Sequence, residues 1–403
     1  MTGPRTADAE IDALPLLRHL LIVARRWSHG LPLDFDAAAQ VRNRVLALNH
    51  QHHLREIPIY AQLAREGDLA DRDPFELARD RLVLSDDWFK SYDPAWIRGD
   101  FASLSAWLET VSTVRLPRFA HRASDLSSWR SELVRHGVFV TVSSGTSTGQ
   151  PSLVPRDEST LAALRSSSGV RFPWSIRAGE YDCLLLTAAG MDSGLQAGAA
   201  GLASRACRVH HLHTPGVYDF LCDAAARRQR AIVFGPPSGL ASLVDELVRA
   251  PRPVELPAES CVVTGGGWKD GLAQDLDALL DAASALLGVD RRRCVDAYST
   301  AELNTVFVSC ANHRYHVPPV VEAVLVDDLL HPLDDTAQAG RLAVFDPFAR
   351  SYPSLATSDH VILRADPCAC GLAGQTLLAP ITRLENAAPR GCGALGVDEP
   401  GYR

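Results

Sequence analysis

The sequence contains almost no lysine. Of its 40 basic residues, only Lys90 and Lys269 are lysines, and all the others are arginines. Such a bias is typical of proteins from GC-rich genomes. Against that background, a retained lysine indicates a position that suits a compact ammonium group better than a planar guanidinium.

Excess positive charge and long hydrophobic runs are also missing. The net charge of −8 argues against nucleic acid as the main partner, because neutralising phosphates requires a basic surface. The apolar segment Leu14–Trp27 is short, and Arg18, Arg25 and Arg26 interrupt or close it, so it does not predict a membrane span. The first residues lack the pattern of a secretory signal. We therefore expect a cytoplasmic protein without a membrane partner.

A disulfide framework is a third absence, although the chain has nine cysteines. In a cytosolic chain of 403 residues, scattered cysteines indicate small buried side chains rather than disulfides. We expect this of most of Cys183, Cys207, Cys222, Cys261, Cys294 and Cys392. The other three, Cys310, Cys368 and Cys370, have a spacing that points to a metal.

Two patterns of hydrophobic residues divide the chain. Apolar residues recur every three or four positions in the first 130 residues, which predicts helices at 11–26, 36–49, 58–66 and 101–112. Short apolar runs follow, which predict strands at 138–142, 182–187, 231–234, 260–264, 293–297, 321–326, 341–345 and 360–364. Between them we expect helices at 157–166, 216–228, 237–249 and 270–287. This alternation indicates an α/β fold with substantial parallel sheet.

A loop rich in serine, threonine and glycine follows the first predicted strand. The stretch Ser143–Ser152 reads "SSGTSTGQPS", and such a turn can surround a phosphate with backbone N–H groups and hydroxyls. It is not a Walker loop, because Gly145 and Gly149 are one residue too close and Gln150 replaces the lysine. Read alone, an ordinary polar loop is an equally good interpretation.

Three further turns follow predicted strands, in a recognisable order. They are "TGGGWKD" (Thr264–Asp270), "DAYSTAE" (Asp296–Glu302) and "SYPSLATSD" (Ser351–Asp359). Together with the loop Ser143–Ser152, they resemble the motifs of the adenylate-forming superfamily, which activates carboxylic acids with ATP.

Within that superfamily the sequence most resembles the acyl-protein synthetases of bacterial luminescence and their phenazine-pathway relatives. The similarity rests on "GGGWK" (Gly265–Lys269), "WFK" (Trp88–Lys90) after "IPIY" (Ile57–Tyr60), and "RGCG" (Arg390–Gly393). Phenylacetate–coenzyme A ligases are similar but more distant. The resemblance implies an α/β fold in which mixed and parallel sheets are flanked by helices. We expect a helical region at 1–130, an adenylation core at 131–380 and a short remnant at 381–403.

The resemblance also implies a nucleotide site. Glu302 would carry Mg²⁺, Asp359 would accept both ribose hydroxyls, and Tyr298 would stack on the adenine. The phosphates would be held by Ser143, Ser144, Gly145, Thr146, Ser147, Thr148 and Gly149. The rest of the nucleotide would lie against Gly265, Gly266, Gly267, Trp268, Asp296 and Ser299.

The sequence departs from the superfamily in the "YSTAE" element. Ala301 stands immediately before Glu302, where a hydroxyl residue is expected. Thr300 would therefore have to reach the α-phosphate.

A second departure concerns the small C-terminal lid that normally brings a catalytic lysine. The sequence ends about where the lid would begin, and no lysine follows Lys269, so we expect the lid to be missing or reduced. Lys269, Arg383 or Arg390 would then stabilise the transition state, or the reaction would be slow. Cys392, between two glycines, matches the acyl-accepting cysteine of the luminescence synthetase, and an incidental exposed thiol is the alternative.

Three cysteines and a histidine form a candidate structural zinc site. Cys310-x5-His316 and Cys368-x-Cys370 supply the Cys₃His set that zinc takes in closed sites. Related coenzyme A ligases carry a similar pair of segments. His313 is a rival ligand, and unliganded core thiols are the alternative.

Other stretches are weaker candidates. The segment Gly190–Gly198 is rich in small residues and is expected to form the wall of an acyl pocket, with His211 or His213 as further lining residues. For the clusters His50–His53 and His210–His213, surface or capping roles are more common than metal binding.

We conclude that the sequence predicts an ATP- and Mg²⁺-dependent enzyme that adenylates a carboxylic acid. An aryl acid is the preferred substrate and a fatty acid the second choice. The acyl group would pass to a thiol or an amine: coenzyme A, a carrier protein or a small amine. A catalytically silent nucleotide-binding or scaffold relative is the alternative, and a homodimer is left open.

Overall fold

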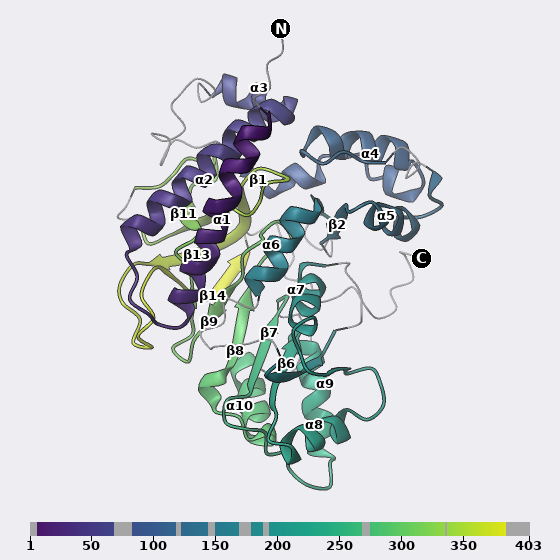
Figure 1. Cartoon of the computed structure of the whole chain (residues 1–403), viewed down its shortest axis with the longest axis vertical. Coiled ribbons are helices and arrows are strands. Elements are labelled where there is room, and N and C mark those ends of the chain that lie inside the picture. The colour runs from purple at the N-terminus through teal and green to yellow at the C-terminus, as the bar shows by residue number, and fades with distance from the viewer. Residues whose placement is uncertain are drawn as a thin grey trace.

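The computed structural model describes residues 6–67, 83–117, 122–143, 150–168, 179–187, 193–267, 275–334 and 337–383 (Figure 1). Its α-helices are α1 (Thr6–Ser28), α2 (Phe35–Glu56), α3 (Pro58–Glu66), α4 (Phe101–Thr110), α5 (Leu126–Arg135), α6 (Glu158–Ser168), α7 (Gly194–Ala203), α8 (Val217–Ala226), α9 (Pro237–Val248) and α10 (Leu276–Leu287). The short 3-10 helices are η1 (Asp86–Lys90), η2 (Trp96–Arg98) and η4 (Arg291–Arg293). None of the helices within these ranges is long and apolar enough to cross a membrane.

A single large sheet forms the centre of the molecule. Its strands are β1 (Leu84–Ser85), β4 (Tyr181–Leu185), β5 (Val209–His211), β6 (Arg230–Gly235), β7 (Cys261–Gly265), β8 (Cys294–Tyr298), β9 (Phe307–Ser309), β10 (Arg314–His316), β11 (Glu322–Val326), β12 (Ala339–Phe345), β13 (Leu355–Arg364) and β14 (Thr376–Arg383). They lie in the order β11-β12-β13-β14-β10-β9-β8-β7-β6-β4-β5, and β1 pairs with β13 outside this path. Strands β4 to β8 are parallel, whereas β8 and β9 are antiparallel, as are the pairs from β9 to β11.

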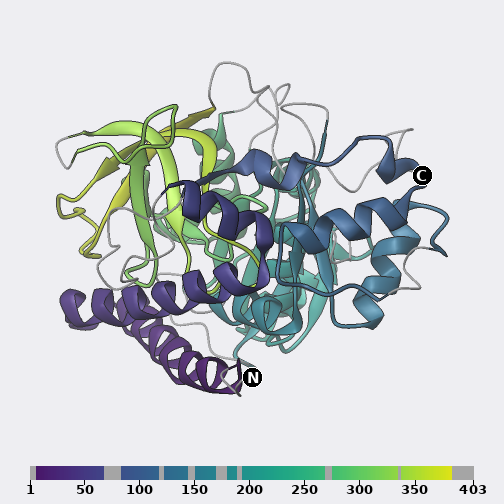
Figure 2. The same cartoon turned by 90° about the horizontal axis from the view of Figure 1, so that it is seen from above.

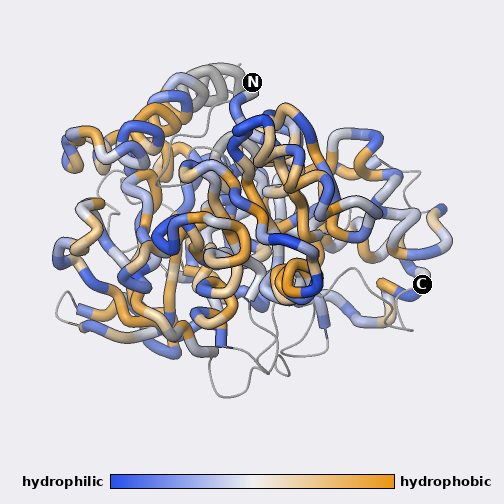
Figure 3. Tube along the Cα trace, turned by 90° about the horizontal axis from the view of Figure 1, so that it is seen from below, coloured by the Kyte–Doolittle hydropathy of each residue, from blue (hydrophilic) through white to orange (hydrophobic). Residues whose placement is uncertain are grey.

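The parallel half is buried on both faces, as its continuous apolar runs predict. Successive side chains along its strands point to opposite faces of the sheet and pack into two different hydrophobic cores. Val233 and Val262 pack against α8, α9 and α10, whereas Ile232 and Val263 face α7. Figure 1 shows these helices around the lower strands, and in Figure 3 hydrophobic and hydrophilic residues alternate along the peripheral helices. The mixed sheet flanked by helices confirms the predicted fold class.

The antiparallel half curves into a lobe of its own (Figure 2). Register shifts interrupt β13 on both sides, between Arg341 and Ala343 of β12 and between His360 and Ile362 of β13 itself. Such bulges bend a strand and increase its twist. The helices α1 and α2 pack on this lobe, where Leu20 and Val45 share a core with strands β9 to β14.

The predicted strand 138–142 forms as β2 (Phe139–Val142), which pairs antiparallel with β3 (Leu153–Arg156) in a separate hairpin. One of the sequence expectations was wrong in detail. The stretch before Asp359 is not a turn between strands, because residues 355–364 form β13. The polar run "TSDH" hides the strand in the sequence, because Thr357 and Asp359 are buried polar residues that alternate with the less buried Ser358 and His360. The proposed division of the chain at residue 130 stays a prediction.

Candidate active site

The candidate site lies at the carboxyl ends of β7 and β8. These strands are parallel neighbours, with Gly265 opposite Ala297, so the segments that follow them emerge at the same edge of the sheet. In open α/β sheets this edge is where ligands bind. The segments are the predicted Gly265–Gly267 turn and the predicted Ser299–Glu302 loop.

The backbone favours glycine at each position of the turn after β7. A side chain at Gly265 would place its Cβ 3.2 Å from the carbonyl oxygen of Ala297. Gly266 and Gly267 have φ angles of 87° and 81°, a left-handed conformation that side chains disfavour. The backbone here can therefore approach a ligand closely. Trp268 and Lys269, which follow, lie outside the described residues.

Glu302 is buried, with 9% of its surface exposed. Burial raises the pKa of its carboxyl, and the negative charge of Asp86 raises it further. Within the described ranges, no lysine or arginine forms an ion pair with Glu302. A buried carboxylate in this situation is stabilised by a bound cation.

Asp86 was missed by the sequence analysis, although it lies just before the quoted "WFK" motif. Its carboxylate accepts a hydrogen bond from Ser358 at 2.6 Å, and it pairs with Arg341 at 3.2 Å and Lys90 at 3.4 Å. Ser358 precedes Asp359 on β13, so the segment η1 is tied to the strand that carries the predicted ribose ligand. Lys90 is thus a buried partner of this carboxylate.

The base of the Ser143–Ser152 loop is closed by hydrogen bonds. Ser143 Oγ accepts from the Ser152 amide at 2.7 Å, and the Ser143 amide donates to the Ser152 carbonyl at 3.1 Å. Gln150 donates through Nε2 to the carbonyls of Lys90 and Tyr92, both at 2.7 Å. Gln150 therefore anchors the loop to the segment after η1. The predicted phosphate ligands Ser144–Gly149 lie outside the described residues.

Tyr298 and Asp359 meet directly. The Tyr298 hydroxyl donates to Asp359 Oδ2 at 2.7 Å, although β8 and β13 are separated by three other strands in the sheet. Asp359 is 5% exposed, and its amide bonds to Thr357 Oγ1. Arg383, whose side chain is not described, is the backbone partner of Asp359 in β14.

Asp296 and Ser299 are held by the protein itself. Asp296 accepts from Thr264 at 2.6 Å and from Tyr315 at 2.7 Å. Burial raises the pKa of Asp296 while these hydrogen bonds oppose the shift. Ser299 Oγ donates to the carbonyl of Thr305, which fixes the loop that carries Glu302.

An apolar cavity extends from the strand ends toward α7. Its empty volume is about 780 Å³, part of which is open to solvent, and most of its exposed lining is apolar. It is lined among others by Gly194 and Gly198 of α7, which belong to the predicted Gly190–Gly198 wall, and by Phe234. Thr300 also lines it, and a hydrogen bond from its buried hydroxyl to Glu302 opposes the rise in the pKa of that carboxyl.

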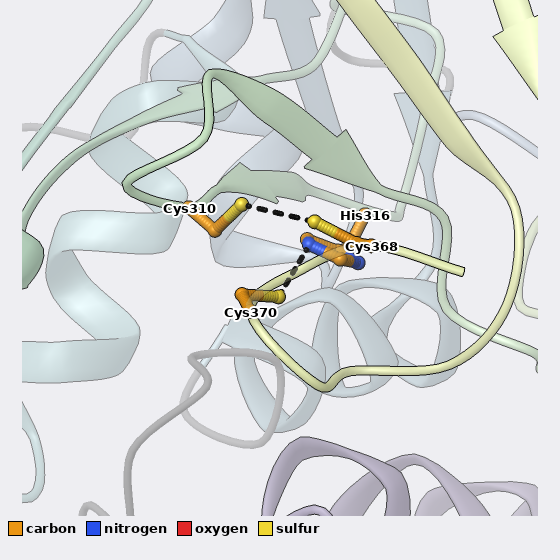
Figure 4. Close-up of side chains that lie close together, drawn as sticks. All are labelled: Cys310, His316, Cys368 and Cys370. Carbon is orange, nitrogen blue, oxygen red and sulfur yellow. Dashed lines mark hydrogen bonds between the residues drawn. The ribbon is translucent and has the colours of Figure 1, made fainter. Parts of the chain in front are cut away.

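The predicted zinc ligands come together. One ligand atom from each of Cys310, His316, Cys368 and Cys370 lies within 4.8 Å of the others, and Figure 4 shows these side chains pointing toward one another. The Sγ atoms of Cys310 and Cys368 are 3.6 Å apart, and Cys370 Sγ is 3.3 Å from His316 Nε2. The rival His313 points elsewhere, 3.3 Å from Asp277.

Helix α1 supports the cysteine loop. Trp27 donates through Nε1 to the carbonyl of Ala373 at 2.8 Å, and its ring lies 6.4 Å from that of His316. The N-terminal helix therefore packs directly on the segment that brings Cys368 and Cys370 into place.

The remaining candidates lie elsewhere or outside the described ranges. His50 contacts the Tyr60 hydroxyl at 2.7 Å, His53 contacts the Arg350 carbonyl, and His210 contacts Thr214. The described lining of the cavity includes neither His211 nor His213. Of the scattered cysteines, Cys183, Cys261 and Cys294 are buried, Cys222 is partly buried and Cys207 is exposed. Arg390 and Cys392 lie beyond the last described residue.

Comparisons with known proteins show what this chain is similar to. Residues 250–399 match the family described as "Acyl-protein synthetase, LuxE". The long-chain-fatty-acid–luciferin-component ligases of Vibrio harveyi and Aliivibrio fischeri are 33% and 32% identical over 138 and 142 residues, 32% of this chain in each case. The match spans only 35% of each of these relatives.

A solved structure of 2-hydroxyisobutyryl-CoA ligase, in complex with 2-HIB-AMP and CoA, aligns with 88% of this chain and 70% of its own at a TM-score of 0.57 and 16% identity. The chain has the fold of the adenylate-forming ligases. The resemblance to acyl-protein synthetases, drawn from "GGGWK" and "RGCG", is confirmed for the segment 250–399.

Replacing Glu302 by glutamine should stabilise the metal-free protein. The pKa of Glu302 is raised on folding, so its ionisation lowers the stability of the folded state as the pH rises through that pKa. Above neutral pH, without nucleotide or divalent ions, we expect Glu302→Gln to raise Tm by about 1–3 °C. Below about pH 4 the gain should vanish, because the carboxyl is then protonated in both states.

Calorimetry across this pH range checks the prediction. The exposed Glu259, which lies outside the helices, is changed to glutamine as the control and should leave Tm unchanged. A Glu302→Gln protein that is less stable than the parent at alkaline pH would contradict it.

Proposed function

We propose that this protein uses ATP to adenylate a carboxylic acid and then passes the acyl group to a thiol or an amine. One observation carries the proposal: Glu302 and the hydrogen-bonded pair Tyr298–Asp359 lie on segments that meet beside a glycine turn and an apolar cavity. These are the groups required for a metal, a ribose and an acyl chain. The match to acyl-protein synthetases supports the proposal.

The chemistry assigns a task to each group. The substrate carboxylate attacks the α-phosphorus of ATP and expels pyrophosphate, so catalysis consists mainly of positioning like charges and neutralising them. Glu302 would hold Mg²⁺, which supplies positive charge to the phosphate oxygens. Asp359, whose carboxylate is oriented by the Tyr298 hydroxyl, would accept the ribose hydroxyls. The Thr300 hydroxyl, which lies beside Glu302 and lines the cavity, would donate to the reacting oxygens.

The acid is one with an apolar body. No charged side chain is among the described residues that line the cavity, so a second charge on the substrate would be buried without a partner. Gly194 and Gly198 leave room on one side, and Phe234 offers an aromatic surface on another. This arrangement favours an aryl acid, with a fatty acid as the second choice.

The proposal leaves three classes of acyl acceptor open. Coenzyme A, a carrier-protein thiol and a small amine each attack an acyl-adenylate in the same way, with AMP as the leaving group. The coenzyme A bound in the similar ligase structure supports a thiol.

The cysteine cluster fits a structural zinc ion. A tetrahedral ion with thiolates at about 2.3 Å keeps its sulfur atoms about 3.8 Å apart, and Cys310 and Cys368 are 3.6 Å apart. His316 Nε2 lies beside the third thiol. The ion would link the loop after β9 to the loop after β13, and it would thereby stabilise the two regions that follow Glu302 and Asp359.

Pyrophosphate exchange into ATP tests the activity. We expect exchange that depends on an aryl or fatty acid from a mixed panel. Glu302→Gln and Asp359→Asn should each lower kcat/KM by about 100-fold, whereas Glu259→Gln should not change it. A parent protein that exchanges with no acid but still binds ATP would support the silent scaffold and overturn the proposed activity.

Filling the cavity tests the acid site. A Cβ at Gly194 would meet no heavy atom within 4 Å, so Gly194→Leu should place its side chain in the cavity. We expect the KM of the bulkiest accepted acid to rise about tenfold or more while the KM of ATP stays constant, because only one subsite changes.

The matched control is Ala200→Leu, a partly buried position on the same helix outside the cavity lining. It should leave both constants unchanged. Equal rises in the two KM values of Gly194→Leu would place the acid elsewhere.

Metal analysis tests the zinc site. Protein purified without chelator should contain about one zinc per chain. Cys368→Ser should lose most of the metal and unfold at a lower temperature. Cys222→Ser, a cysteine outside the cluster, should retain it. Parent protein without stoichiometric metal would remove the zinc proposal.

A further inference from the structure

A buried arginine lies at the base of the hairpin that carries the Ser143–Ser152 loop. Arg156 is the last residue of β3 and is completely buried. Within the hairpin its guanidinium donates to Thr141 Oγ1 of β2, and outside the hairpin it donates from Nε to Asn304 Oδ1 at 2.7 Å. The side chain therefore connects the hairpin to the loop after β8.

The same guanidinium binds the backbone on both sides of Glu302. Arg156 Nη2 donates to the carbonyl of Ala301 at 2.7 Å and to that of Leu303 at 3.2 Å. Because a guanidinium presents its donors in a rigid plane, these two bonds fix the direction of the intervening residue. The carboxylate-bearing position is thus held from the hairpin side.

Burying the charged guanidinium of Arg156 costs free energy, because the group loses its hydration. A buried cation requires compensation, and the described partners of Arg156 are neutral oxygens, the last being the Tyr352 hydroxyl at 3.0 Å. The charges of Asp346 and Glu302 act on the same hydroxyl, so both acids are in electrostatic range of this cluster. A neutral side chain could join two loops without burying a charge.

We propose that Arg156 is a positioning residue that couples the β2–β3 hairpin to Glu302, so that the closed base of the Ser143–Ser152 loop and the metal-binding carboxylate keep one relative geometry. The inference rests on the proposed function. In this arrangement, the divalent ion meets a carboxylate whose position relative to the β2–β3 hairpin is already set. The ribose side of the site, built on Tyr298 and Asp359, does not depend on this contact.

The test compares two measurements: the binding of Mn²⁺ in the presence of ATP, and the binding of AMP in the absence of metal. Arg156→Lys keeps the charge but loses the planar fork. We expect it to weaken Mn²⁺ binding in the presence of ATP by about tenfold, measured from the magnetic-resonance signal of free Mn²⁺, and to leave AMP binding without metal within twofold. In exchange assays the Mg²⁺ requirement should rise by a similar factor while the KM of the acid stays constant.

Two further variants keep the test decisive if Arg156→Lys does not fold. Tyr352→Phe removes one partner of Arg156 and leaves both carbonyl contacts, so Mn²⁺ affinity should stay within twofold. Thr141→Val removes the hairpin contact and should weaken Mn²⁺–ATP binding but not AMP binding.

The possible results distinguish a failure of the proposed function from a failure of the positioning role of Arg156. A parent protein that does not bind Mn²⁺ with ATP would overturn the proposed function. A parent that binds, with unchanged affinity in both Arg156→Lys and Thr141→Val, would overturn only the role of Arg156. If the variants lost AMP binding and Mn²⁺–ATP binding equally, Arg156 would contribute only to the general stability of the protein. This result would also contradict the inference.

Discussion

The hydrogen bond between Tyr298 and Asp359 requires the sheet to curl. Four steps separate β8 from β13 in the strand order, which in a flat sheet would place them about 19 Å apart. Yet the Tyr298 hydroxyl lies 2.7 Å from Asp359 Oδ2. The antiparallel half must therefore fold back toward the parallel half, and the bulges in β13 provide the bend. The candidate nucleotide site exists only because of this curvature, since its residues come from both halves.

The charged groups around the site leave the carboxylate of Glu302 without a described cation as partner. Asp86 is neutralised by Lys90 and Arg341, and Arg156 is satisfied by neutral oxygens, two of which are backbone carbonyls beside Glu302. Glu302 is thereby fixed in place while no described cation pairs with it, and burial disfavours its charge. Such a residue is poorly suited to stabilising the fold and well suited to binding a divalent ion. Stability and function oppose each other at this position.

The sequence predicted local features well and long-range contacts poorly. The continuous apolar runs predicted the parallel strands, and the glycine turn at Gly265 follows its strand as expected. The start of β13 and the anchoring role of Gln150 were missed, because residues 355 and 356 pair with β1 and Gln150 bonds the segment after η1, both far along the chain. The sequence analysis missed Asp86 and Arg156 for the same reason, because a single aspartate or arginine carries no local signal. The contacts of Arg156 with Ala301 and Asn304, and of Asp86 with Ser358, join segments more than 140 residues apart.

A structure of the protein with AMP and a divalent ion tests the central claim most directly. The account predicts one nucleotide whose ribose contacts Asp359 and whose phosphate shares a metal with Glu302, while the apolar cavity lies open beside the phosphate. A nucleotide bound away from either carboxylate, or the two carboxylates directed into separate cavities, would contradict it.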